Sequence, residues 1–289
     1  MMHTKSPQPT FLHHLARHGR VQDLWKSLDN RIDIDIDARG GYMLSTALYD
    51  AVRCDNFNAA QVLLAMGANP NRSNRYNTTP LHIVTLTKNE DMAILLLANG
   101  AGVNVENGED VTIENDLICK PGAMHRGGTA LQHACRSESL DIVNVLIDFG
   151  SDVFIKTADG WTTLMLASAV GCQATVRVLI KRGVDPRAMS VDGRTAMDIA
   201  RHQGHDAVEV TLVDEVERTE GSSRDSGSFT HIRDGSFTHT MPPSNIPSRN
   251  DVYTPWRPER PLRRDRPCRR IEMILNKLHS CHQPQFSEM

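Results

Sequence analysis

The stretch NTTPLHIVTLTKNEDMAILLLANGA, residues 77–101, decides the fold of this 289-residue chain. It begins with a polar segment and a Thr-Pro turn, continues through two short apolar segments, and ends near a glycine. This order of features is typical of a helical hairpin. The fold then depends on whether the stretch occurs once or recurs along the chain.

The features of this stretch recur at a fixed spacing. Equivalent threonines follow one another in steps of 33, 50, 33 and 33 residues, and each has a Leu or Met two positions later. The five threonines are Thr46, Thr79, Thr129, Thr162 and Thr195. The glycines that keep the same steps are Gly67, Gly100, Gly150 and Gly183. A period of 33 residues with one insertion of 17 residues indicates a repeat architecture.

Each period has the pattern of one helix-turn-helix unit. In the unit that begins near Thr129, Leu131, Ala134 and Cys135 have the spacing of one helix face, and a second apolar group follows at 142–147. The glycine after that group stands where a helix ends in the left-handed conformation. One such unit buries too few apolar side chains to offset the backbone entropy of about 33 residues. Neighbouring units must therefore stack into a solenoid.

The motifs of these units resemble ankyrin repeats. The resemblance is carried by TPLH at 79–82, GANPN at 67–71, DGWTTLMLA at 159–167 and DGRTAMDIARHQGH at 192–205. It covers about residues 10–213 and implies an all-α solenoid of about six helix-turn-helix repeats with hairpin-like loops. The expected repeats lie near 10–38, 41–73, 74–106, 124–156, 157–189 and 190–213, with an insertion at about 107–123.

The chain departs from the family pattern at two kinds of position. Four repeats replace the histidine of the TPLH motif by Tyr49, Gln132, Met165 and Asp198. Three turns between helices, where the family often has glycine, carry Asp55, Lys88 and Glu138. Where the histidine is present, at His13 and His82, the resemblance implies a structural group that hydrogen-bonds within its turn and to adjacent backbone.

Composition narrows the class of protein. The chain has 32 basic and 35 acidic residues, which favours neither a nucleic-acid-binding protein nor a membrane-surface protein. Its apolar runs are far shorter than the roughly 18 residues of a membrane span, and the first ten residues lack the apolar core of a secretory signal. The six cysteines form no CxxC pair, so a reduced cytoplasmic or nuclear setting is expected.

Catalytic motifs are absent from the sequence, which contains no GxSxG, P-loop, HExxH or helix-opening GxGxxG. We therefore expect a protein that is not an enzyme and needs no cofactor. Cys119, His125, His133 and Cys135 are candidate zinc ligands, but their spacings do not match paired zinc knuckles. Because Cys135 also falls at a small buried helix position, a packed thiol is the favoured interpretation and no metal is predicted.

The resemblance implies that a protein partner contacts the loop tips and the exposed side of the first helix of each repeat. Arginine and large amphipathic side chains, which are enriched at interaction hot spots, occur at many of these positions. The predicted partner-binding residues are Arg17, Tyr42, Met43, Arg53, Arg75, Tyr76, Leu86, His125, Arg126, Arg136, Trp161, Arg194 and His202. They favour an acidic or phosphorylated peptide-like partner, and the alternative is that they are ordinary solvated positions.

Two further features of the repeats permit more than one interpretation. The insertion is rich in carboxylates, so it is either a solvated excursion or a regulatory flap that competes for the basic positions. Asn71 and Asn104 follow Gly-Ala turns and have a leucine eight residues earlier. In some family members such asparagines are modified by an asparaginyl hydroxylase, so the resemblance implies candidate hydroxylation sites at both.

The repeat pattern stops after residue 213. Composition predicts a disordered N-terminus at 1–9 and a mostly disordered, Pro/Arg-rich tail at 214–289. The tail contains two overlapping PxxPxR frames, which resemble ligands of Src-homology-3 domains because proline favours the polyproline II conformation. The two frames consist of Pro255, Pro258 and Arg260, and of Pro258, Pro261 and Arg263.

The end of the tail carries a helical pattern. Ile271, Ile274, Leu275 and Leu278 have the i, i+3, i+4, i+7 spacing of one helix face. They predict a short helix at 268–280. Because an isolated helix of this length is marginal in water, it must dock either on the solenoid or on a partner.

These observations favour a non-catalytic adapter that binds protein through its solenoid and its tail. The alternative is a regulatory subunit or substrate receptor whose tail recruits an enzyme, such as a ligase or a kinase. CRRIEMILNKL at 268–278 resembles a ligase-recruiting box only in part, because the usual leucine before the Cys-Arg pair is missing. Nucleic acid is not an expected partner, since Asp265 interrupts the basic run at 263–270 and base-stacking aromatics are nearly absent nearby.

Overall fold

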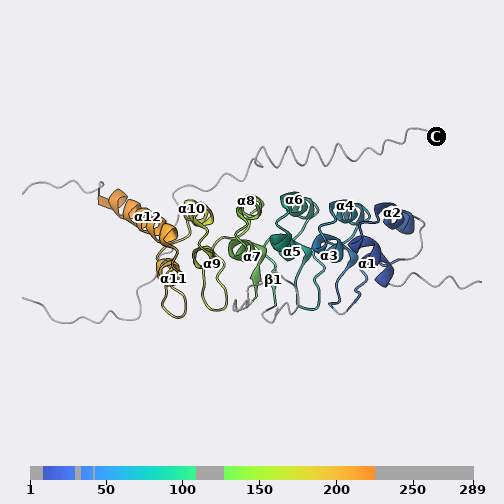
Figure 1. Ribbon diagram of the computed structural model, residues 1–289, viewed down its shortest axis with the longest axis horizontal. Helices are drawn as coiled ribbons and strands as arrows, with labels where there is room; N and C mark the ends of the chain where they lie inside the picture. Colours follow the sequence, from blue (N-terminus) through green and yellow to red (C-terminus); the bar gives the residue numbers. More distant parts are fainter. Residues whose placement is uncertain (1–8, 30–33, 42, 109–126, 225–289) are drawn as a thin grey trace, which may run out of the picture.

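The computed structural model describes residues 9–29, 34–41, 43–108 and 127–224 (Figure 1). The first helices of the repeats are α1 (Pro9–Arg17), α3 (Ala47–Arg53), α5 (Pro80–Thr87), α7 (Ala130–Arg136), α9 (Thr163–Val170) and α11 (Ala196–Gln203). The second helices are α2 (Val21–Asp29), α4 (Phe57–Ala65), α6 (Glu90–Ala98), α8 (Leu140–Asp148), α10 (Gln173–Lys181) and α12 (Asp206–Arg224). The expected solenoid of six helix-turn-helix repeats is confirmed.

The helices form two rows (Figure 1). The first helices lie in one row, in which each packs on the first helix of the next repeat. The second helices lie in the other row, which we call the outer row. The described parts of the loops that join one repeat to the next project beyond the first helices on one side of the stack. The helices of the described segments include none that is long and apolar enough to cross a membrane.

The hydrophobic core lies between the two rows. The leucine two positions after the repeat threonine is fully buried in four repeats, and Met197 packs partly buried against the same core. The four leucines are Leu48, Leu81, Leu131 and Leu164. Burying one such side chain contributes roughly 1.5–3 kcal/mol. The periodic leucines of the sequence are therefore core residues of the solenoid.

The repeat threonines start the first helices. Thr162 has extended backbone, and its Oγ1 accepts a hydrogen bond from the backbone N–H of Met165 at 3.2 Å. Thr46 and Thr195 accept the equivalent bond from the N–H three residues later. An N-cap of this kind satisfies one of the backbone donors that a helix leaves unpaired. The side chain of the repeat threonine caps α3, α7, α9 and α11, which accounts for its recurrence at this position.

The turn between the two helices of each repeat contains a residue in the left-handed region. The six residues are Gly19, Asp55, Lys88, Glu138, Gly171 and Gly204, with φ between 56° and 84°. An L-residue in this region costs about 1–2 kcal/mol. The three departures from glycine seen in the sequence are therefore strained turns.

Glycine at two of these strained turns is expected to stabilise the protein. Lys88→Gly and Glu138→Gly should each raise the free energy of unfolding by about 0.5–1 kcal/mol, because relief of strain outweighs the added entropy of the unfolded chain. Urea denaturation measures the change. Asp55→Gly is the contrast, since it also removes the bond that Asn89 Nδ2 donates to Asp55 Oδ1 at 2.7 Å. If both glycine variants were no more stable than the unchanged chain, the two turns would not be strained.

A short antiparallel pair of strands closes the base of the insertion. β1 (Glu106–Asn107) pairs with β2 (Gly128–Thr129), with Asn107 opposite Gly128. Residue 107 therefore belongs to the repeat, and the insertion predicted at about 107–123 begins later. Residues 109–126 lie outside the described residues. The strand pair brings Asn107 and the start of α7 together across the insertion.

The last helix is longer than the repeat pattern predicts. The sequence places the start of the tail at 214, but α12 continues to Arg224. Val208 and Leu212 anchor its first half in the core, and an ion pair of 2.6 Å between Glu215 and Arg218 supports the next turn. The rest of the tail, with the PxxPxR frames and the helix expected at 268–280, lies outside the described residues, as do residues 1–8.

Candidate protein-interaction face

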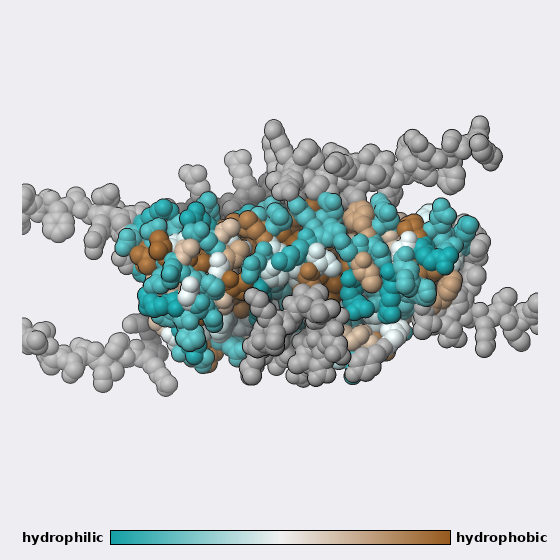
Figure 2. Space-filling model, viewed as in Figure 1, coloured by the Kyte–Doolittle hydropathy of each residue, from teal (hydrophilic) through white to brown (hydrophobic). Residues whose placement is uncertain are grey.

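The candidate site is the exposed side of the first helices together with the adjoining loops, which we call the inner face. In the view of Figure 2, hydrophobic residues are scattered among hydrophilic ones over the coloured surface. Non-obligate protein interfaces have about the same apolar fraction as the rest of a protein surface. Specific charged and aromatic side chains must therefore mark a binding site on such a surface.

The predicted helix positions differ in exposure. Arg53 and His202 are exposed, whereas Leu86 and Arg136 are half-buried. Leu86 packs against the core with part of its side chain. These residues occupy equivalent positions in different repeats, so they extend along the solenoid instead of converging on one point. A partner that meets several of them must be extended.

Arg17 has a structural contact that the sequence did not reveal. Its Nε donates to Asp50 Oδ2 at 3.0 Å, and Ser45 Oγ donates to the other carboxylate oxygen at 3.2 Å. The Asp50 side chain is only 2% exposed. A buried carboxylate requires such compensation. Arg17 therefore joins the first two repeats, with about half of its side chain left exposed.

Three of the predicted loop residues come together. The Arg75 backbone N–H donates to the Met43 carbonyl at 2.9 Å, which joins two consecutive loops. The Arg75 guanidinium lies 5.2 Å from the centre of the Tyr76 ring, within cation–π distance. We call Met43, Arg75 and Tyr76 the Arg75 cluster. It presents an exposed cation beside a half-buried aromatic ring.

A buried asparagine holds the loop of the Arg75 cluster. Asn74 Oδ1 accepts from the backbone N–H groups of Tyr76 at 2.9 Å and Thr78 at 3.0 Å. Its Nδ2 donates to the Tyr49 hydroxyl at 3.1 Å. A loop fixed in this way loses little conformational entropy when it binds a partner. Asn74 and Tyr49 are supporting residues that the sequence analysis missed, although Tyr49 stands at a departure from the repeat motif.

Trp161 is less exposed than a residue at a loop tip. It is half-buried and packs against the core, and its carbonyl accepts from the Thr157 N–H at 3.0 Å. Arg194, one repeat further on, is exposed. Their two loops are joined by a hydrogen bond of 3.1 Å from the Val191 N–H to the Asp159 carbonyl. Tyr42, His125 and Arg126 lie outside the described residues.

His82 is a structural histidine, as predicted. Its Nδ1 accepts from the Thr79 backbone N–H at 3.2 Å, so the ring carries its proton on Nε2, which donates to the Gly128 carbonyl at 3.1 Å. Burial lowers the pKa of His82 to about 4, so the ring is neutral at pH 7. His13 makes the corresponding bond of 2.8 Å to the Ser45 carbonyl.

Gln132 replaces this histidine one repeat later. Its Oε1 accepts from the Thr129 N–H at 3.0 Å, and its Nε2 donates to the Ile155 carbonyl at 3.0 Å. An amide thus makes both bonds of the imidazole without a titratable group. The departure from the family motif leaves the connection between repeats intact.

The two candidate hydroxylation sites connect consecutive loops. Asn71 Oδ1 accepts from the Gly102 N–H at 2.6 Å, and Asn71 Nδ2 donates to the Gly100 carbonyl at 2.9 Å. Asn104 Oδ1 accepts from the Asp152 N–H at 2.9 Å. Both residues are exposed, and their amides stabilise the stack. Their hydroxylation stays a prediction.

Cys135 is a packed thiol. Its side chain is fully buried, and burial raises its pKa to about 12, so it remains protonated. His133 Nε2 lies 3.2 Å from Asn107 Oδ1, in the contact that closes the base of the insertion. Cys119 and His125 lie outside the described residues. The described ranges contain no group of three His, Cys, Asp or Glu residues arranged to hold a metal.

Comparison with known proteins agrees with this architecture. A family model for ankyrin repeats in three copies matches residues 12–107, 105–190 and 131–219. The solved structure of an ankyrin repeat domain from Acinetobacter baumannii AYE is similar, with a TM-score of 0.61 and 27% sequence identity. The match covers 72% of this chain and 99% of that domain.

Curated relatives match over part of their length. An ankyrin repeat protein of Rickettsia bellii is 32% identical over 142 residues, which are 47% of this chain and 35% of the relative. Human ankyrin repeat and SOCS box protein 16 is 31% identical over 191 residues, which are 57% of this chain and 42% of the relative. The chain therefore spans less than half the length of these relatives.

Proposed function

The chain belongs to the ankyrin-repeat family, and from this premise we propose that it is a non-catalytic adapter that binds a protein partner through its inner face. Ankyrin repeats are generally modules of protein–protein interaction. The observation that carries the proposal is the Arg75 cluster, in which an exposed arginine and an aromatic ring are held on a fixed loop. Arginine and tyrosine are enriched at interaction hot spots.

We further propose that the partner presents an acidic or phosphorylated segment. Arg53, Arg75 and Arg194 are exposed on three repeats of the inner face. Neighbouring helices pack at about 8–10 Å, which is close to the Debye length of about 8 Å at physiological salt. Arg194 lies several helix spacings from Arg53 and Arg75, so it repels them little, while an extended anionic segment could meet more than one of the three arginines. Guanidinium groups bind carboxylate and phosphate through paired hydrogen bonds.

Charge reversal tests this site. The double variant Arg53→Glu/Arg75→Glu is expected to capture the partner about 10-fold to 100-fold less well, because complementary charges become repulsive. Affinity capture with the full-length chain, quantified by mass spectrometry at two salt concentrations, measures the effect. Arg177→Glu/Lys181→Glu is the matched control, since it makes the same charge change at exposed positions of α10 in the outer row.

The control should retain every partner that the unchanged chain captures. Circular dichroism should show that both variants keep the fold. Equal capture by the inner-face variant and the unchanged chain, with the fold intact, would contradict the proposed site.

The alternative role is a regulatory subunit or substrate receptor that recruits a ligase or kinase through the tail. One relative is by name a SOCS box protein as well as an ankyrin repeat protein, which gives this alternative its support. Capture with residues 1–224 distinguishes the two roles, because an enzyme recruited by the tail would be lost and the inner-face partner retained. A Src-homology-3 partner of the PxxPxR frames and a cytoplasmic or nuclear location are further parts of the proposal.

A further inference from the structure

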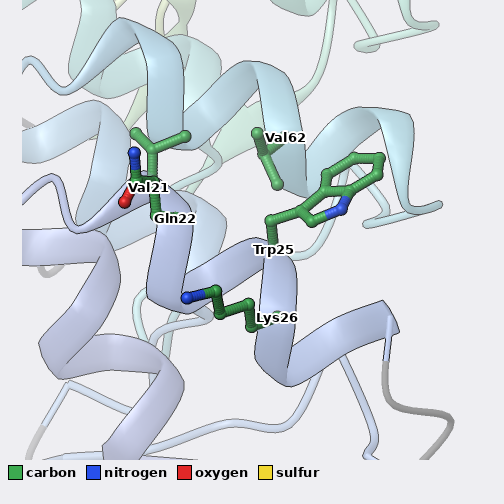
Figure 3. A pocket seen from close by; sticks show the side chains of 5 residues that line it. All are labelled: Val21, Gln22, Trp25, Lys26 and Val62. Carbon is green, nitrogen blue, oxygen red and sulfur yellow. The ribbon is translucent and has the colours of Figure 1, made fainter. Parts of the chain in front are cut away.

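The outer row carries an apolar hollow at its N-terminal end (Figure 3). The hollow has a volume of about 270 Å³ and lies between α2 and α4. Figure 3 shows Val21 and Trp25 projecting from α2, with Val62 of α4 beside the Trp25 indole. Gln22 and Lys26 complete its lining. The hollow is separate from the inner face, which lies on the first helices and loops.

The hollow leaves a large aromatic side chain incompletely covered. Trp25 is 45% exposed, although a tryptophan can bury 150–250 Å² when it is fully packed. Val62 is only partly buried next to it. An apolar segment seated on this surface would remove both side chains from water. The hollow therefore fits an occupant with one apolar face.

We propose that residues 268–280 of the same chain form a helix that docks in this hollow. Ile271, Ile274, Leu275 and Leu278 supply the apolar face that this surface requires. A helix of this length is marginal when isolated in water, so contact with Trp25 stabilises the helix as well as covering the hollow. The proposal does not depend on the identity of any inner-face partner.

The hollow has one charged lining residue, Lys26, and the segment has one carboxylate, Glu272, besides the cations Arg269, Arg270 and Lys277. Lys26 lines the hollow and extends a flexible cation to its rim. Glu272 directly follows Ile271, so it lies beside the apolar face of the segment. When the apolar face is seated against Trp25, the Glu272 carboxylate can approach the Lys26 ammonium. The pair favours the helix direction that places Glu272, and not Arg270 or Lys277, beside Lys26.

The connecting chain is long enough to allow the contact. Five steps of about 8–10 Å separate α12 from α2 along the outer row, and α12 itself adds about 28 Å at 1.5 Å per residue. The segment must therefore span less than about 80 Å. Residues 225–267 can extend to about 140 Å, and seven of these 43 residues are proline, which favours extended linkers.

Paired cysteines test the contact in the full-length chain. The Lys26→Cys/Glu272→Cys variant is expected to form an intrachain disulfide under mild oxidation, because such a bond needs Cα atoms within about 7 Å. Peptide mapping distinguishes it from bonds to the native cysteines. The control is Lys181→Cys/Glu272→Cys, in which the first cysteine is exposed on α10. It should give at least tenfold less of the mapped bond.

Two results would overturn the proposal. Equal cross-linking in both variants would show that the segment has no preferred site. Bonds that form only between chains, with a yield that rises with protein concentration, would assign the hollow to a second copy.

Amide hydrogen exchange provides an independent readout on the chain without added cysteines. Residues 268–280 should be protected, and both Trp25→Ser and Ile274→Ser should reduce this protection at least tenfold. Trp25→Ser should leave the protection of α6 and α8 unchanged, which verifies the fold. No protection of the segment in the unchanged chain, or protection that survives both substitutions, would contradict docking at this hollow.

Discussion

Lowering the pH from about 6.5 to about 4 is expected to remove about 3 kcal/mol of the free energy of unfolding through His82 alone. The folded protein holds the pKa of His82 at about 4, below its ordinary value of 6.5. Between these two values the unfolded chain binds a proton that the folded chain does not. The contribution of His82 to the free energy of unfolding is therefore complete above pH 6.5. It falls as the pH is lowered and is lost at about pH 4.

The pKa of His82 is low because of the position of its ring in the folded protein. Burial disfavours the imidazolium, and protonation of Nδ1 would remove the acceptor that binds the Thr79 N–H. Carboxylates titrate in the same pH range, so the effect must be measured as a difference between variants. His82→Gln is the matched variant, because Gln132 makes the same two kinds of hydrogen bond in the next repeat.

Urea denaturation of the two proteins at several pH values gives the result. The His82→Gln variant should have similar stability at pH 7.5 and should lose about 3 kcal/mol less than the unchanged chain on acidification to pH 4. The reciprocal change, Gln132→His, should introduce a new loss in the same direction. Identical pH dependence of the unchanged chain and the His82→Gln variant would rule out the buried neutral imidazole.

Gly171→Ala is expected to lower the free energy of unfolding by about 2–3 kcal/mol. Gly171 has φ of 84° at the end of α9, where an alanine costs about 1–2 kcal/mol. A Cβ atom at this position would also lie 2.6 Å from His205 Nδ1 and 2.8 Å from its Cε1. His205 would have to move and give up the 3.2 Å contact between its Nε2 and the Ala169 carbonyl, which costs about 1 kcal/mol more.

Gly204→Ala separates the cost of backbone strain from the cost of the contact with His205. Gly204 has φ of 74° at the equivalent turn of the next repeat, but nothing lies within 4 Å of its expected Cβ. Its replacement should cost about 1–2 kcal/mol from backbone strain alone. Adding His205→Ala to the Gly171→Ala variant should also remove the clash. Equal losses at Gly171 and Gly204 would show that His205 does not crowd the turn.

The repeat architecture could be predicted from the sequence because its determinants are local and periodic. Thr129 caps a helix and Leu131 enters the core two residues later, and both roles depend on their place within one repeat. The positions of the strained turns could be located in the sequence for the same reason, because Lys88 and Glu138 stand where other repeats have glycine. The 33-residue spacing repeats each requirement in every layer of the stack.

The remaining features depend on contacts between repeats, which periodicity does not specify. Arg17 and Asp50 belong to different repeats, so nothing local in the sequence indicates their ion pair. Trp161 looks exposed because it follows a turn, yet packing against the core half-buries it. The continuation of α12 to Arg224 has no counterpart in the earlier repeats, so the repeat pattern ends before the helix does.

The arrangement of the inner-face residues also could not be predicted from the sequence. The sequence identified Arg75 and Tyr76 as candidates, but their proximity to Met43 results from a backbone hydrogen bond between loops. The Asn74 contacts that hold this loop come from side chains on two repeats. These supporting residues hold the Arg75 cluster on a fixed loop.

Site-specific photo-cross-linking tests the proposed inner-face interaction most directly. A benzophenone amino acid placed at Tyr76 or Leu86 reports on the inner face, and one placed at Ala65 reports on an exposed position of α4 in the outer row. After irradiation of the full-length chain in cell extract, we predict a partner cross-linked from both inner-face positions and absent at Ala65. Cross-links to that partner from Ala65, with none from Tyr76 or Leu86, would contradict binding through the inner face.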